Sequence, residues 1–168
     1  RRVYIYTEGE DQRKMKKVCI AASRDVGFQC ASWAKENTPA GFELTEEMSA
    51  ADIIICVMYE KILGPELIKK STCFNFHPGI LPEYKGSGTF SWVIINEEKK
   101  AGITLHLIDR GLDTGDVIEI REFLIGKEDT AYSLFLRGED VIFKMFKNWY
   151  VDLLHGQYTA MPQRGDKG

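Results

Sequence analysis

The chain has 168 residues, a length that fits one domain with a full hydrophobic core. Hydrophobic residues make up 44% of it and charged residues 28%, as in an ordinary globular protein. Its formal charge of -3 argues against general nucleic-acid binding, which needs a clustered basic surface. Because no apolar run approaches the roughly 20 residues that span a bilayer, and no secretory pattern opens the chain, we expect a cytoplasmic protein without a membrane segment.

The hydrophobic pattern predicts strands that alternate with helices. The expected strands are 3–6, 18–22, 52–58, 72–77, 102–108 and 117–124. The expected helices are 27–36, 65–70, 90–98 and 130–154. This order indicates one α/β domain over residues 1–160, with a mostly parallel sheet flanked by helices. We expect a disordered polar tail at 161–168. The last helix has an apolar stripe that favours packing on its own sheet, and both a monomer and a homodimer stay open.

The four cysteines share no C-x-x-C spacing and lie in apolar surroundings, which favours reduced core side chains. Alternation places Cys73 on the same strand face as Asn75 and His77, further from the strand end. A thiolate nucleophile needs a base and an electropositive setting, so we favour core packing for Cys73 over a nucleophilic role. We expect no metal site.

Three polar residues stand where a core pattern would not place them. Asn75 and His77 are two apart on one strand, so both side chains point to one face near its carboxyl end. Asp113 follows Ile108 in a loop that could bring a carboxylate beside the imidazole. A structural histidine and a turn-forming aspartate are the alternative interpretations.

This trio suits acyl transfer to an amine. The amide of Asn75 and a protonated His77 can donate hydrogen bonds to the oxyanion that forms during attack. Asp113 can favour the charged imidazole and relay the proton of the amine. No seryl or cysteinyl nucleophile is needed, because the acceptor amine is itself nucleophilic.

Three segments add a specific order and spacing. They are A-D-I-I-I-C-V-M-Y-E-K-I-L at 51–63, F-N-F-H-P-G-I-L-P-E-Y-K-G at 74–86 and G-I-T-L-H-L-I-D-R-G-L-D-T-G-D-V-I at 102–118. Here the chain resembles the catalytic domain of the 10-formyltetrahydrofolate-dependent formyltransferases. The resemblance implies a Rossmann-like catalytic domain, a formyltransferase, and 10-formyltetrahydrofolate as its co-substrate. It matches Asn75 to the family's asparagine, His77 to its general acid and Asp113 to its aspartate.

The resemblance also implies a folate site. The family binds folate largely through main chain, and the corresponding residues here are Lys61, Ile62, Leu63, Gly79, Ile80, Leu81, Pro82, Ile108, Asp109, Gly111 and Leu112. An apolar wall with main-chain hydrogen bonds suits a flat pterin. For His106 we favour a core or supporting place over a catalytic role.

The departures from the family bear on the acceptor. Glycinamide ribonucleotide formyltransferase opens with a strand and a Gly/Ser/Asn-rich phosphate loop, whereas here 3–6 runs into the acidic T-E-G-E-D-Q-R-K. Methionyl-tRNA formyltransferase has a further C-terminal domain and a basic surface, and the deformylase has a regulatory domain. We therefore expect a sugar N-formyltransferase with a small amine acceptor, a nucleotide-linked amino sugar. Alternatives are the purine or tRNA enzyme, hydrolysis of the donor, and a folate-binding module without turnover.

Overall fold

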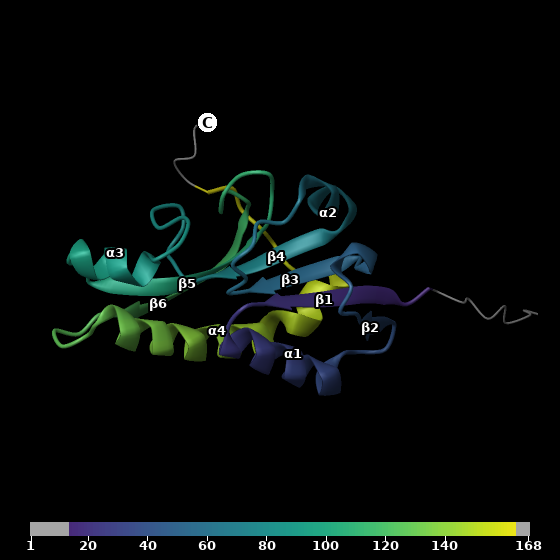
Figure 1. Cartoon of the computed structure of the whole chain (residues 1–168), viewed down its shortest axis with the longest axis horizontal. Coiled ribbons are helices and arrows are strands. Elements are labelled where there is room, and N and C mark those ends of the chain that lie inside the picture. Colours follow the sequence, from purple (N-terminus) through teal and green to yellow (C-terminus); the bar gives the residue numbers. More distant parts are fainter. Residues whose placement is uncertain (1–13, 164–168) are drawn as a thin grey trace, which may run out of the picture.

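The computed structural model describes residues 14–163, which form a six-stranded sheet with helices on both faces (Figure 1). The strands are β1 (Lys16–Ala22), β2 (Phe42–Leu44), β3 (Ile53–Val57), β4 (Thr72–His77), β5 (Lys100–Leu107) and β6 (Val117–Leu124). The helices are α1 (Asp25–Asn37), the 3-10 turn η1 (Met48–Ala50), α2 (Pro65–Lys70), α3 (Thr89–Ile95) and α4 (Ala131–His155). The strand expected at 3–6 lies outside the described residues.

The order of the strands across the sheet is β2-β1-β3-β4-β5-β6. The pairs from β2 to β4 are parallel, whereas β5 runs antiparallel to β4 and β6 antiparallel to β5. The expected α/β fold with a mostly parallel, helix-flanked sheet is therefore confirmed. Neither β2 nor η1 was predicted, because three residues are too few to show a periodic pattern.

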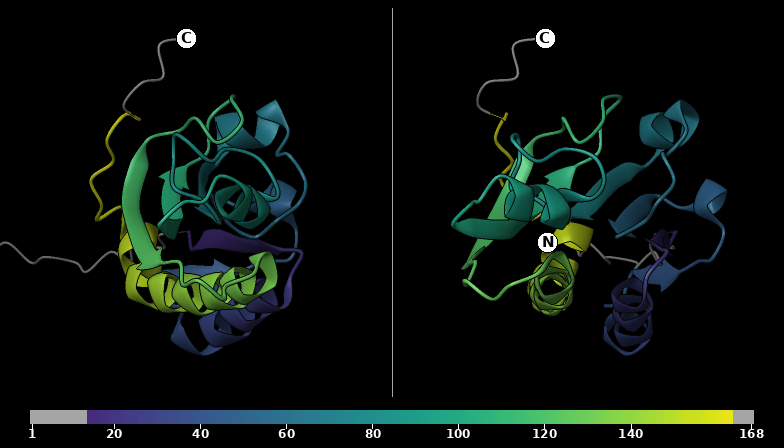
Figure 2. Two further views of the ribbon diagram at one scale, coloured as in Figure 1. Left: turned by 90° about the vertical axis from the view of Figure 1, so that its left-hand side faces the viewer. Right: turned by 60° about the vertical axis from the view of Figure 1, so that its left-hand side comes forward.

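The central strand β3 is covered on both faces, as its apolar sequence predicts. Ile53, Ile55 and Val57 belong to the large core cluster under α1 and α4, while Ile54 and Cys56 belong to a smaller cluster on the opposite face. Figure 2 shows α1 and α4 together on one side of the sheet, with α2 on the other. The helix α2 packs against the smaller cluster through Leu67 and Ile68.

The long helix α4 is fixed at both ends and along its apolar stripe. Thr130 and Ser133 form a reciprocal capping box at its start, and Gly156 ends it with a φ of 70°. Phe146 and Tyr150 are fully buried against the sheet and α1. The expected packing of this helix on its own sheet is confirmed. In the described part of the chain, no helix has the length and apolar character needed to cross a membrane.

After α4 the chain returns to the sheet. The backbone N–H and carbonyl of Met161 both bond to Val117 at the start of β6, at 2.9 and 2.8 Å. Two residues further on, the side chain of Gln163 bonds to the loop before β6. Met161 and Gln163, which sequence analysis assigned to a disordered tail, thus have defined contacts.

Candidate active site

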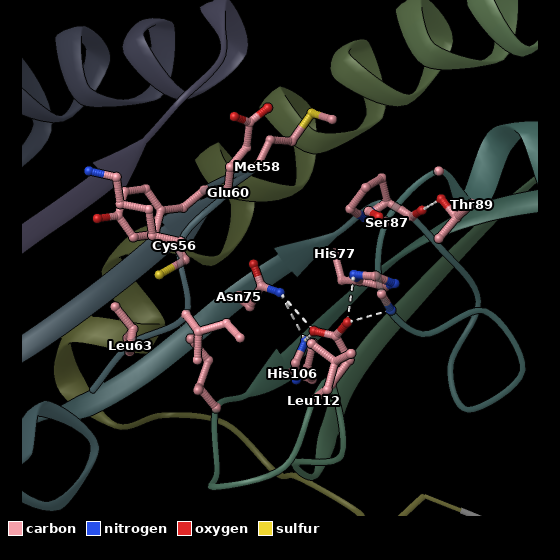
Figure 3. Close-up of a pocket in the computed structure, with 18 of the residues that line it drawn as sticks. Cys56, Met58, Glu60, Leu63, Asn75, His77, Ser87, Thr89, His106 and Leu112 are labelled. Atoms are coloured by element: carbon pink, nitrogen blue, oxygen red, sulfur yellow. Dashed lines mark hydrogen bonds and ion pairs between the residues drawn. The ribbon is translucent and has the colours of Figure 1, made fainter. Parts of the chain in front are cut away.

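A cleft of about 940 Å³ opens beyond the carboxyl ends of the parallel strands, where α/β sheets bind ligands. Its wall is built from the segments that follow β1, β3 and β4, the loop between β5 and β6, and Ala131 and Phe135 at the start of α4. Figure 3 shows Asn75 and His77 near its centre, with Leu63 on one side and Ser87 and Thr89 on the other. The structure therefore brings all three predicted catalytic residues, Asn75, His77 and Asp113, into one cleft.

The register between β4 and β5 fixes the first pair of polar groups. Asn75 and His106 are direct partners across these strands, and Asn75 Nδ2 lies 3.2 Å from His106 Nε2. His106 is buried and its Nδ1 lies 2.7 Å from the carbonyl of Leu107. Burial lowers the pKa of His106, which favours the neutral ring. Nδ1 therefore carries the hydrogen, and Nε2 accepts from the Asn75 amide.

Asp113 connects these residues. Its Oδ1 accepts from Asn75 Nδ2 at 3.4 Å and lies 3.6 Å from His106 Nε2. Its Oδ2 accepts from the backbone N–H of Gly86 at 2.8 Å and lies 3.5 Å from His77 Nδ1. The carboxylate thus faces side chains of both β4 and β5. The predicted approach of Asp113 to the imidazole of His77 is present.

The ring of His77 is held between two acceptors. Its Nε2 lies 2.6 Å from the carbonyl of Tyr84, and its Nδ1 faces Asp113. Only a ring that carries hydrogen on both nitrogens satisfies both oxygens. The arrangement accordingly suits the imidazolium, the form that can donate a proton or stabilise negative charge.

The loop that carries Asp113 is tightly constrained. Asp109 Oδ1 accepts from the backbone N–H of Gly111 at 3.0 Å and from the hydroxyl of Thr114 at 2.6 Å. At Gly115 a Cβ atom would lie 1.9 Å from the carbonyl oxygen of Leu107, so no side chain fits without moving the loop. Asp113 itself has a φ of 52°, an uncommon conformation for a residue other than glycine. The loop is therefore shaped in advance of any ligand.

The residues proposed for folate binding divide into two groups. Seven of them line the cleft: Lys61, Ile62, Leu63, Ile108, Asp109, Gly111 and Leu112. The other four do not line it: Gly79, Ile80, Leu81 and Pro82. The Thr104 hydroxyl donates to the Gly79 carbonyl at 2.6 Å and accepts from the Leu81 N–H at 3.2 Å. These bonds hold 79–82 against β5, away from the cleft wall.

The loop after the first described strand corrects one argument about the acceptor. In the sequence, the acidic segment after 3–6 stands where a phosphate loop would be expected. In the structure, β1 leads into α1 through Ser23 and Arg24, and Arg24 lines the cleft beside its salt-bridge partner Glu60. The acidic segment after 3–6 is therefore not the β1–α1 connection, and it does not argue against a phosphate-bearing acceptor.

Cys73 packs in the core as expected. It is 3% exposed, lies in the smaller core cluster and does not line the cleft. Burial raises the pKa of its thiol to about 11, which opposes formation of a nucleophilic thiolate. No group of three or more histidine, cysteine, aspartate or glutamate side chains among residues 14–163 is placed to hold a metal ion.

Two residues that support the site, Gly86 and Gln163, were not predicted from the sequence. The backbone N–H of Gly86 carries no side-chain signal, although its φ of 78° is of the kind that favours glycine. His106 was expected in a core or supporting place, and its buried ring beside Asn75 agrees with that expectation. Nothing in the sequence around Gln163 indicated that it contacts the Asp113 loop.

Comparison with known proteins identifies the family of the chain. The model of the formyl transferase family matches residues 7–148, which is most of the chain. The chain belongs to the formyl transferase family. This confirms the resemblance that sequence analysis drew from segments 51–63, 74–86 and 102–118.

Relatives within the family differ in their acceptors. Methionyl-tRNA formyltransferase of Clostridium novyi is 34% identical over 91% of this chain and 49% of its own length. GDP-perosamine N-formyltransferase of Brucella melitensis biotype 1 is 30% identical over 86% of this chain and 58% of its own length. The chain thus spans about half the length of these relatives.

Solved structures share the fold. One is the N-formyltransferase of Helicobacter canadensis in complex with folinic acid and dTDP-3-aminofucose. It superposes with a TM-score of 0.79 at 23% identity, covering 90% of this chain and 69% of that one. At this level of identity the likeness establishes the fold.

Proposed function

We propose that this chain transfers the formyl group of 10-formyltetrahydrofolate to the amine of a small acceptor, an amino sugar linked to a nucleotide. One observation carries the proposal. In a member of the formyl transferase family, Asn75, His77 and Asp113 meet at the floor of a single cleft. Such a constellation provides hydrogen-bond donors and a proton carrier beside one reacting carbon.

In the proposed reaction the acceptor nitrogen attacks the formyl carbon directly. A carbon–nitrogen bond forms, and the carbonyl electron pair moves to oxygen, which becomes an oxyanion. Collapse of this intermediate breaks the bond from the carbon to N10 of the folate. The acceptor nitrogen loses one proton and N10 gains one, so that the products are a formamide and tetrahydrofolate.

In the proposed mechanism, the amide of Asn75 and the ring of His77 donate hydrogen bonds to the oxyanion. Asn75 Nδ2 and His77 Nδ1 reach this carboxylate only through long contacts of 3.4 and 3.5 Å. A developing oxyanion competes for these hydrogens, since catalytic hydrogen bonds often align fully only when the reacting group is present. Asp113 then accepts the amine proton, directly or through water, and returns it toward N10.

The folate proposal is supported by exposed apolar side chains on the cleft. Ile62 is 87% exposed and Leu112 is 59% exposed, and both belong to the cleft wall. Together with Leu63 and Ile108 they provide a surface that a flat pterin would cover. The related Helicobacter canadensis structure, which holds folinic acid, supports the same ligand class.

The proposed acceptor is supported by polar residues of the cleft and by the relatives. Arg24, Ser87 and Ser91 all line the cleft and give it polar groups suited to a sugar or a phosphate. The Brucella relative is named for GDP-perosamine, a nucleotide-linked amino sugar. A second candidate is formylation of methionyl-tRNA, favoured by the higher identity of the Clostridium novyi enzyme.

The test is incubation with 10-formyltetrahydrofolate and a panel of amines: GDP-perosamine, dTDP-3-aminofucose, glycinamide ribonucleotide and methionyl-tRNA. Mass spectrometry then detects the gain of one formyl group. We expect product with a nucleotide-linked amino sugar. Product with methionyl-tRNA or glycinamide ribonucleotide alone would replace the proposed acceptor. Formate release without an acceptor would indicate hydrolysis, and folate binding without turnover a binding module.

A variant pair tests the site itself. His77→Ala is expected to lower kcat by about 10²–10³-fold, the usual cost of removing one oxyanion donor, with binding of 5-formyltetrahydrofolate kept. His155→Ala is the matched control, because His155 ends α4 and does not line the cleft. Equal activity of the two variants would remove His77 from the mechanism.

A further inference from the structure

The side chain of Gln163 bonds to the backbone of the loop that carries Asp113. Its Nε2 donates to the carbonyl of Asp113 at 2.8 Å and to the carbonyl of Gly115 at 2.9 Å. The two partners lie 50 and 48 positions earlier in the chain. One amide group therefore binds both sides of Thr114, in the middle of the loop.

The backbone fixes the place of this amide. Met161, two residues earlier, is paired through both its N–H and its carbonyl with Val117, the first residue of β6. This pairing brings Gln163 beside the loop that precedes β6. Both amide hydrogens of Gln163 are used, whereas its Oε1 is buried without a partner. Turning the amide over would set Oε1 against two carbonyl oxygens, so the donor orientation is the one that the surroundings allow.

The backbone conformation of the Asp113 loop is one that hydrogen bonds from outside the loop can stabilise. Asp113 has a φ of 52°, which costs free energy for a residue with a Cβ atom. Its carboxylate must nevertheless keep one direction, because its two oxygens face Asn75 on one side and Gly86 and His77 on the other. Hydrogen bonds to the carbonyls on either side of Thr114 favour this conformation over more relaxed ones.

We propose that Gln163 is a positioning residue, which holds the Asp113 carboxylate in its place by binding the backbone of that loop. The inference rests on the proposed formyl transfer, in which Asp113 carries the proton. Gln163 does not line the cleft, so it acts through the loop and touches no substrate.

Two variants of Gln163 test the inference. Gln163→Met keeps the length of the side chain and removes both donors. Gln163→Glu keeps its shape and has no donor while ionised, but one when protonated. Gln157→Met is the matched control, because Gln157 is an exposed residue of the same returning segment. The measurements are kcat with 10-formyltetrahydrofolate and the best amine of the panel, well below the thermal midpoint, and hydrogen exchange of the amides of 112–115.

We expect Gln163→Met to lower kcat about 10-fold, the effect of losing two hydrogen bonds of ordinary net strength, and to speed the exchange. The activity of Gln163→Glu relative to Gln163→Met should rise as the pH falls through the pKa of the introduced carboxyl. The control should match the wild type in both measurements.

If Gln163 has a purely structural role, Gln163→Met has a lower thermal midpoint but a kcat within about twofold of the wild type. The pH profiles of Gln163→Met and Gln163→Glu are then parallel. That result overturns the inference. Exchange at 112–115 that matches the control also overturns it. A wild-type chain that transfers no formyl group refutes the proposed function and catalytic positioning with it. In that case, hydrogen exchange of the amides of 112–115 still decides whether Gln163 stabilises the loop.

Discussion

Replacing Asp113 with asparagine removes one charge and changes little in shape, which makes it a sharp test of the proton path. Asp113 Oδ2 lies 3.5 Å from His77 Nδ1, and the side chain is 12% exposed. At this separation two unit charges near a protein surface attract each other by about 4 kcal/mol. If all of that attraction supports the transition state, the loss corresponds to about 10³-fold in rate, and solvent screening makes about 10²–10³-fold the expected range.

The assay is steady-state formyl transfer by Asp113→Asn, with binding of 5-formyltetrahydrofolate measured separately. We expect kcat to fall by this factor while folate affinity is kept, since an asparagine oxygen can still accept from the Gly86 N–H. Asp116→Asn, the same change three positions along the chain and outside the cleft wall, should stay within about twofold of the wild type. A kcat of Asp113→Asn within about tenfold of the wild type would refute a proton-carrying role for this carboxylate.

Three further predictions follow from the packing of the chain. Gly115→Ala should lower the free energy of unfolding by about 1–3 kcal/mol, measured in urea, because its methyl group would overlap the carbonyl of Leu107; an unchanged midpoint would contradict the tight contact. Iodoacetamide at pH 8 should label the folded chain slowly, because all four cysteines are buried. Cys73→Ala should keep kcat within about twofold of the wild type, and a large loss of kcat would instead support a nucleophilic role for Cys73. The pKa of Asp129 is lowered to about 2, chiefly because its carboxylate accepts from the backbone N–H of Gly126. The stability that Asp129 provides is therefore present above about pH 4 and is lost as the pH falls through about 2. The difference in thermal midpoint between wild type and Asp129→Asn should therefore shrink over that interval, and a constant difference would rule out this origin.

Much of the fold could be predicted because its elements are long or strongly patterned. The strands 72–77 and 117–124 and the helix 65–70 were predicted with the observed bounds, since alternation marks the two strands and a first-turn proline marks the helix. The reversal of direction at β5 leaves no mark in the local pattern. It depends on which strands pair, a long-range property of the sheet.

The site was predictable to the extent that polar residues interrupt apolar strands. Asn75 and His77 stand out for this reason, and the order of the segments around them points to Asp113. The place of 79–82 was not predictable, because it depends on bonds from Thr104 across the sheet. The cytoplasmic location, the choice between monomer and homodimer, and the catalytic roles stay predictions.

The pairing of Asn75 with His106 has a consequence for altering what this protein acts on. Because these two residues are register partners and His77 lies two positions along the same strand, the backbone ladder of the sheet places all three. The segment from Ser87 to Ser91, which forms the opposite wall, belongs to a loop and the start of a short helix. Exchanging that segment between relatives should retune the choice of amine while leaving the reacting groups in place. The structure therefore predicts that the proposed reacting groups and this wall can be varied separately.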